Sequence, residues 1–208
     1  MKKENIILLI GLICAAITSV AVFIPWHNFI DFFKLGEFGH FISNDFYNTY
    51  IGVVVVYMIV LVCKYRDLKG AFLQGCIILA VLTVFHLGIK LLIGEWTPRP
   101  SGNSGGFPSG HSQAVFALAF LVSIRTKKLT IPVFLFAMLC AWSRIYSTHY
   151  ETGEPYEPAH YPYQVMFGSY FGVVFTYLMY KYLEPRREKI LKVFCKPFVK
   201  ISNLFKKK

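Results

Sequence analysis

The sequence has 208 residues, of which 55% are hydrophobic, and a mean hydropathy of +0.50. Apolar residues make up about 45–50% of an average soluble domain, so this composition argues against a soluble protein and for a membrane protein. A formal net charge of +11 would raise the question of nucleic-acid binding in a soluble protein, but the positions of the basic residues give another explanation.

Six apolar runs separated by short polar breaks follow one another along the chain. A membrane-spanning helix needs about 17–25 apolar residues, and most of the runs have that length, although the fourth is shorter. We therefore expect an all-α integral membrane bundle of six transmembrane helices over residues 1–183, followed by a basic cytoplasmic tail over 184–208. The six runs are 5–26, 48–63, 70–93, 111–124, 129–146 and 163–183.

The basic residues predict the orientation of this bundle. All but four of the 22 Lys and Arg residues lie before the first run, in alternate breaks between runs, or at the C-terminal end from Lys181 onward. Cytoplasmic loops are enriched in Lys and Arg, so both termini are expected in the cytoplasm. The short chain and the basic inner tail favour a bacterial inner membrane. Because topology accounts for the charge, no nucleic-acid partner is expected.

The tail combines apolar and basic residues at helical spacing. Ile190, Phe194 and Phe198 share one face, while Lys189 and Lys192 belong to another. This pattern favours an amphipathic helix lying on anionic lipids of the inner leaflet. The alternative is a solvated basic tail.

Three of the four remaining cations lie at the outer face in this topology. Lys90 ends the third run, Arg99 lies in the following loop, and Arg144 ends the fifth run. Snorkelling to the headgroups explains any one of them alone, but three together indicate an anion site. The five cysteines form no C-x-x-C pair, and we expect neither a metal site nor a cofactor.

The loop over 97–111 is rich in Gly and leads directly into the fourth run. Free backbone N–H groups and the positive dipole end at a helix start bind anions. Ser109, Gly110 and His111 lie at this point and add further donors.

The run Phe107-Pro108-Ser109-Gly110-His111 resembles the central motif of the type 2 phosphatidic acid phosphatase superfamily. That family has three motifs. The first is Lys, six residues, Arg-Pro, and the second is Pro-Ser-Gly-His. The third is Ser-Arg, five residues, His, three residues, Asp. The resemblance covers Lys90 to about Gly172 and implies a membrane lipid phosphatase that forms a phosphohistidine. The resemblance implies that Lys90, Arg99 and Arg144 hold the phosphoryl oxygens and that Ser109 and Gly110 add hydrogen bonds. It also implies that His111 protonates the leaving group and that the last His attacks phosphorus.

The chain departs from the first and third motifs. Eight residues instead of six separate Lys90 from Arg99, and Ser143-Arg144 is followed by two histidines, His149 and His160. The segment from His160 to Gly168 resembles the opening of the last span in the family. We therefore interpret 148–159 as an insertion and predict His160 as the nucleophile, with His149 as the alternative.

Gln164 then occupies the place of the family's Asp, which orients the nucleophilic His and stabilises its charged form. Gln accepts the same hydrogen bond without supplying charge. Glu151, Glu154 and Glu157 in the insertion are candidates to replace the carboxylate, the alternative being that they solvate an exposed loop.

The expected substrate is a lipid phosphate or pyrophosphate at the periplasmic face. The resemblance suggests undecaprenyl pyrophosphate, phosphatidylglycerophosphate, phosphatidate or a lipid A phosphate. Two alternatives use the same site: a lipid-to-lipid phosphotransferase, and a degenerate member that binds lipid phosphate without turnover. A channel or transporter is disfavoured because the cations collect at one face instead of running through the bilayer.

Overall fold

The computed structural model describes residues 2–24, 42, 52, 56, 68–100, 102, 104–146 and 159–190. All regular structure in this part of the chain is helical. The second predicted span and most of the predicted tail helix lie outside the described residues.

Five of the six predicted spans correspond to helices whose ends differ from the prediction by a few residues. The third span is continuous but changes character along its length, because its middle turns are π-helical. The long elements are α1 (Lys3–Phe23), α5 (Leu68–Leu79), the π-helix η2 (Ala80–Leu87), α6 (Gly88–Ile93), α7 (Gly110–Arg125), α8 (Thr130–Tyr146) and α9 (Pro162–Leu183). Short 3-10 turns are η3 (Gly94–Trp96), η4 (Lys127–Leu129) and η5 (Glu184–Arg186).

Three helices of the described residues are long and apolar enough to cross a membrane. They cover Lys3–Phe23, Leu73–Ile93 and Lys127–Ile145. Helix α7 has only 16 residues, and α9 is diluted by Tyr, Gly and Ser along its 22 residues. The described part of the chain is therefore all-helical, and the length and composition of these three helices are those of membrane-spanning segments.

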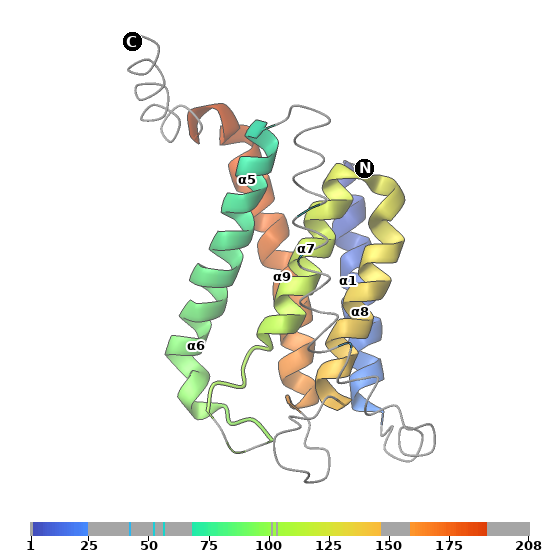
Figure 1. Ribbon diagram of the computed structural model, residues 1–208, viewed down its shortest axis with the longest axis vertical. Coiled ribbons are helices and arrows are strands. Elements are labelled where there is room, and N and C mark those ends of the chain that lie inside the picture. The colour runs from blue at the N-terminus through green and yellow to red at the C-terminus, as the bar shows by residue number, and fades with distance from the viewer. Residues whose placement is uncertain are drawn as a thin grey trace.

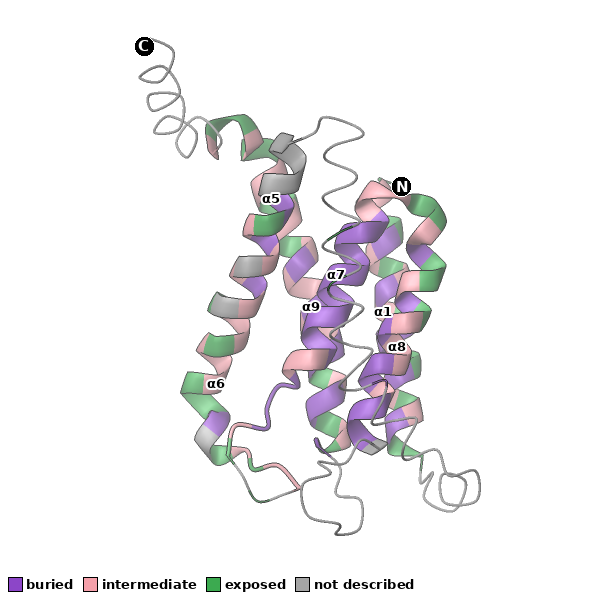
Figure 2. Ribbon diagram, in the orientation of Figure 1, coloured by how far each residue is buried: buried purple, intermediate pink, exposed green. Residues whose placement is uncertain are grey.

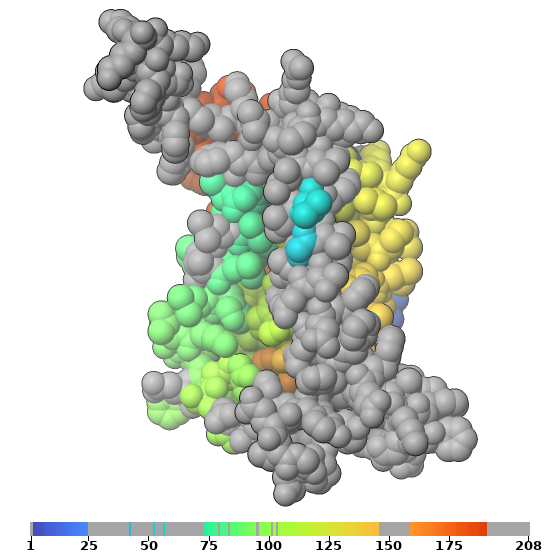
Figure 3. Space-filling model, in the orientation of Figure 1, coloured from blue at the N-terminus to red at the C-terminus, as the bar shows by residue number. Residues whose placement is uncertain are grey.

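Helix α7 forms the centre of the bundle, and its residues from Ser112 to Ser123 are all buried (Figure 2). It packs against α8 and α9, while α1 packs against both of these helices. Close approach of α9 to α7 depends on Gly168 and Gly172, because a Cβ at either position would lie within 2.5 Å of an α7 backbone oxygen. Helix α6 lies at one edge of the molecule and has no buried residue (Figure 3).

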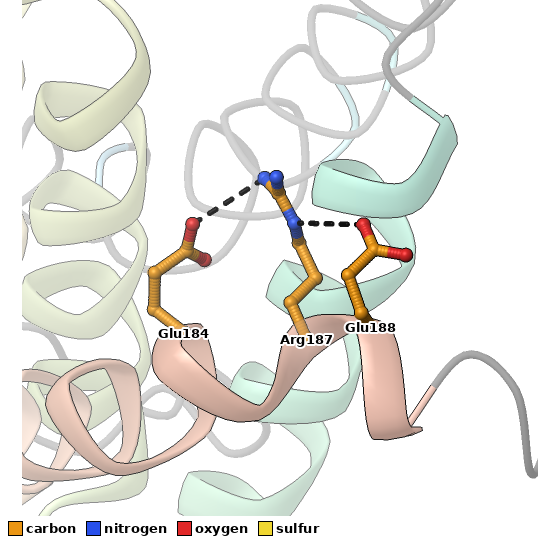
Figure 4. A network of polar contacts seen from close by, with 3 residues as sticks. All are labelled: Glu184, Arg187 and Glu188. Atoms are coloured by element: carbon orange, nitrogen blue, oxygen red, sulfur yellow. Dashed lines mark hydrogen bonds and ion pairs between the residues drawn. The ribbon is translucent and has the colours of Figure 1, made fainter.

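The two ends of the bundle differ in chemistry. At the end with the N-terminus, the Lys3 ammonium donates to the carbonyl of Ile124, and the Tyr177 hydroxyl donates to Asn5 Oδ1 at 3.0 Å. Beyond α9, Arg187 pairs with Glu184 at 3.3 Å on the surface (Figure 4); such exposed pairs contribute little stability. The ends of α6 and α8 and the starts of α7 and α9 all lie toward the opposite end, with α6 set apart from the other three helices (Figure 1).

Candidate active site

The loop between α6 and α7 is shaped by hydrogen bonds within itself. The N–H of Gly105 donates to the carbonyl of Gly94 at 2.9 Å, and that of Gly106 donates to Thr97 at 2.9 Å. Gly105 has φ +77°, a left-handed conformation that favours glycine. The Lys90 side chain runs past this turn, since a Cβ on Gly105 would lie 4.0 Å from its Cε. The loop thus brings the lysine of the first motif alongside the second motif.

Ser109 caps the start of α7. Its Oγ accepts from the Ser112 N–H at 3.5 Å and from the Ser112 hydroxyl at 3.0 Å. Because both bonds use the oxygen as acceptor, the hydroxyl hydrogen of Ser109 stays available as a donor. The N–H of Gly110 lies in the first turn, where backbone donors have no intrahelical acceptor. This helix start therefore presents donors to an anion.

His160 lies just before α9 and is only 2% exposed. Its Nδ1 is 3.0 Å from the carbonyl oxygen of Gly106 and 3.1 Å from Oε1 of Gln164. A carbonyl oxygen is only an acceptor, so Nδ1 carries the hydrogen and the lone pair is on Nε2. The hydrogen bond expected between Gln164 and His160 is present.

The orientation of the Gln164 amide is fixed by its other partners. Its Nε2 donates to the carbonyl of Pro98 at 2.9 Å and to the Tyr163 hydroxyl at 3.2 Å, while Oε1 accepts from the Tyr161 N–H at 3.1 Å. A flipped amide would lose both the Pro98 and the Tyr161 bonds. The oxygen therefore faces His160, and the tautomer of His160 is determined.

The positive charges gather around the two histidines. Arg144 is buried at the end of α8, with 4% exposure, and it is the charged side chain with the largest electrostatic effect on both His111 and His160. Arg99 acts on both histidines as well, and Lys90 acts on His111. The Nε atom of Arg99 is buried and has no hydrogen-bond partner among the described residues. Each of the three predicted phosphate-binding cations therefore lies near enough to at least one of the two histidines to act on it electrostatically.

The environment of His160 favours its neutral form. Burial, and then the charge of Arg144, lower the pKa of His160 from 6.5 to about 3, although its hydrogen bonds to Gln164 and Gly106 oppose the shift. A neutral ring with a lone pair on Nε2 is a nucleophile.

A second histidine–glutamine pair, His86 and Gln113, lies next to the start of α7. His86 Nδ1 is 3.0 Å from Oε1 of Gln113, whose Nε2 donates to the carbonyl of Val81 at 3.3 Å. The edge of the His86 ring packs against Gly110, where a Cβ would lie 2.9 Å from the ring. His86 is therefore a hydrogen-bonded helix histidine that supports the second motif.

Several contacts of the site were not predicted from the sequence. They include the carbonyls of Pro98 and Gly106, and the close packing of Gly168 on Ser109, where a Cβ would lie 2.5 Å from the carbonyl oxygen. Gly168 and Gly172 form a G-x-x-x-G pattern in α9, which is a signal for close helix packing in membranes.

Other predicted candidates cannot be placed. His149, Glu151, Glu154 and Glu157 lie outside the described residues, so the choice of nucleophile and the proposed carboxylate remain predictions. Within the described ranges, no group of three or more His, Cys, Asp or Glu side chains has the arrangement of a metal site.

Comparison with protein families gives a match to the PAP2 superfamily over residues 71–188. Comparisons with curated proteins and with solved structures gave no match. The matched region covers more than half of the 208 residues and includes all three motifs that the structure brings together. The chain therefore belongs to the PAP2 superfamily, whose members are phosphatases acting on phosphate esters.

Proposed function

We propose that the chain is a lipid phosphatase that works through a phosphohistidine on His160. The observation that carries this proposal is the hydrogen bonding of His160, a buried ring whose Nδ1–H is held by two carbonyl oxygens. Its Nε2 lone pair is available in a region where Arg99, Arg144 and Lys90 gather. Phosphoryl transfer spreads negative charge over the equatorial oxygens, and fixed cations shielded from water stabilise that charge.

In the first step, the Nε2 lone pair of His160 attacks phosphorus and forms a P–N bond. The bond between phosphorus and the lipid oxygen breaks, and the leaving oxygen takes a proton from the imidazolium form of His111, which becomes neutral. In the second step, a water molecule attacks phosphorus, the P–N bond breaks, and His111 takes up the proton from that water. The products are inorganic phosphate and a lipid that carries one phosphoryl group fewer.

The site is expected to face the periplasm. Lys2, Lys3 and the basic turn after α7 lie at the bundle end that holds the N-terminus, whereas the site lies at the other end of α7 (Figure 1). By the positive-inside rule, the basic end is cytoplasmic. This orientation favours lipid phosphates of the outer leaflet over soluble cytoplasmic phosphates.

The test is phosphate release by the purified protein from a panel of lipid phosphates and pyrophosphates, in the presence of EDTA. We expect release from at least one lipid, and its loss in His160→Ala and His111→Ala. Brief incubation with a lipid carrying ³²P should label the wild-type protein with an acid-labile, base-stable phosphate, which is typical of phosphohistidine.

His149→Ala is the informative comparison. If His149→Ala abolishes labelling and His160→Ala does not, the nucleophile is His149 and the assignment to His160 is wrong. Transfer of the label to a second lipid in place of water would identify a phosphotransferase. Lipid binding without any labelling would identify a degenerate member of the family.

A further inference from the structure

The side chain of Gln164 has two ends that contact different parts of the site. Its oxygen accepts hydrogen bonds from His160 Nδ1 and from the Tyr161 N–H. Its Nε2 donates to the carbonyl of Pro98 at 2.9 Å. Pro98 directly precedes Arg99, so one amide group joins the nucleophile to the arginine loop.

The end of this loop is held on α9 by the Ser109 N–H, which donates to the Gln164 carbonyl at 3.0 Å, whereas the other described backbone bonds near Arg99 are internal to the loop. Gly102, Gly105 and Gly106 donate their N–H groups to carbonyls of Arg99, Gly94 and Thr97, all within the loop. Gly106 also lies directly on the amide, since a Cβ there would be 2.3 Å from Gln164 Nε2. The position of Arg99 relative to His160 therefore depends on the Gln164 amide and on the Gly106 carbonyl that it borders.

An aspartate at position 164 could accept the hydrogen bond from His160 but could not donate one to the Pro98 carbonyl. A carboxylate has no N–H to donate, and it would leave the Pro98 carbonyl facing another acceptor. Aspartate is also one methylene shorter. This chain has eight residues between Lys90 and Arg99, so its arginine loop is longer than the family pattern.

We propose that Gln164 is a positioning residue with a double role: its oxygen aligns His160, and its NH₂ group docks the longer arginine loop that binds phosphate. This inference rests on the proposed function. It predicts that the two roles can be separated by substitutions at this single position.

Gln164→Glu keeps the acceptor for His160 and removes the donor to Pro98 with almost no change in shape. We expect the KM for the lipid and the inhibition constant of inorganic phosphate to rise about tenfold, because the displaced Arg99 binds phosphate less well in every state. The kcat at saturation should stay within about threefold of wild type, because the carboxylate still accepts the Nδ1–H.

Two further variants serve as comparisons. Tyr163→Phe removes the other bond of Gln164 Nε2, at 3.2 Å, but leaves the Pro98 contact, so KM and the phosphate inhibition constant should not change. Gln164→Met removes both ends of the amide, so kcat should fall by about a hundredfold in addition to the rise in KM.

Hydrogen–deuterium exchange of the peptide covering Gly94–Gly106 gives a readout that does not require turnover. Exchange should be faster in Gln164→Glu than in wild type and unchanged in Tyr163→Phe, because the loop amides of Gly105 and Gly106 open more often once the loop is undocked. If Gln164→Glu has wild-type exchange and a wild-type phosphate inhibition constant, the docking role is refuted. If the wild-type protein releases no phosphate, the proposed function fails, and the exchange comparison still decides whether Gln164 holds the loop.

Discussion

Gly168→Ala should move the active-site residues at the start of α9 away from those at the start of α7, without changing any catalytic or phosphate-binding side chain. A Cβ at Gly168 would lie 2.5 Å from the carbonyl oxygen of Ser109 and 3.1 Å from Cβ of Ser112. Ordinary van der Waals contact begins at 3.4 Å, so the two backbones must separate by about 0.9 Å, the difference between 3.4 and 2.5 Å. The obstacle is backbone and cannot rotate away.

The separation moves His160 and Gln164 at the start of α9 away from Ser109 and His111 at the start of α7. It also stretches the bond between the Ser109 N–H and the Gln164 carbonyl, which is 3.0 Å long. A misplacement of about 1 Å in an active site costs on the order of a hundredfold in rate. Overpacking a core typically destabilises by about 1–3 kcal/mol, so the protein should still fold.

The assay is phosphate release by purified protein, with thermal unfolding and size-exclusion chromatography as measures of folding. The matched control is Gly75→Ala on α5, where a Cβ would have nothing within 4 Å and activity should be that of wild type. A Gly168→Ala protein that keeps wild-type kcat would show that the fit of α9 on α7 does not set the geometry of the site.

The remaining predictions concern charge, hydrogen bonding and pH. Arg144→Lys should lower kcat/KM by about a hundredfold, because a point charge replaces the forked donors of the guanidinium; near-normal steady-state kinetics would contradict this. Ser109→Ala should lower kcat/KM by about tenfold, and it should also lower the melting temperature because the cap of α7 is lost. Since the pKa of His160 is lowered to about 3, the ring stays neutral as the pH falls, and its protonation should not reduce the rate between about pH 7 and pH 5. The kcat/KM of Gln164→Glu divided by that of wild type should decrease toward acidic pH, because a carboxylate beside His160 raises the pKa of that ring. Ionisation of the substrate affects both proteins equally and cancels in this ratio. A ratio that does not change with pH would contradict the coupling.

The helices could be predicted because the apolar runs are long and the breaks are strongly polar. Within the described residues, the predicted third, fourth, fifth and sixth spans differ from the observed helices by at most two residues at each end. The π-helical turns of Ala80–Leu87 could not be predicted, because an apolar run of eight residues looks the same for either hydrogen-bonding pattern. The six-span topology remains a prediction.

Local sequence rules predicted only the part of the candidate site whose residues lie close together in the sequence, whereas the roles of Lys90, Arg144 and His160 were predicted from the resemblance to the family. A Gly-rich loop entering a helix predicted the donors at Ser109 and Gly110 from local rules. The partners of Gln164 and His160 followed no such rule, because the carbonyls of Pro98 and Gly106 are 66 and 54 residues away in the sequence. Any residue has a carbonyl, so only the tertiary fold determines which one is used.

The Gln113 side chain has a consequence for how the bundle assembles. Its amide joins His86 and the Val81 carbonyl on the third span to the fully buried face of α7. If the third span slid along α7 by one turn, both ends of the amide would be left without partners in a place that water does not reach, at a cost of several kcal/mol. Apolar side chains alone would tolerate many such offsets, so the Gln113 amide favours the register in which the two helices dock and, with it, the height of Lys90 relative to the second motif.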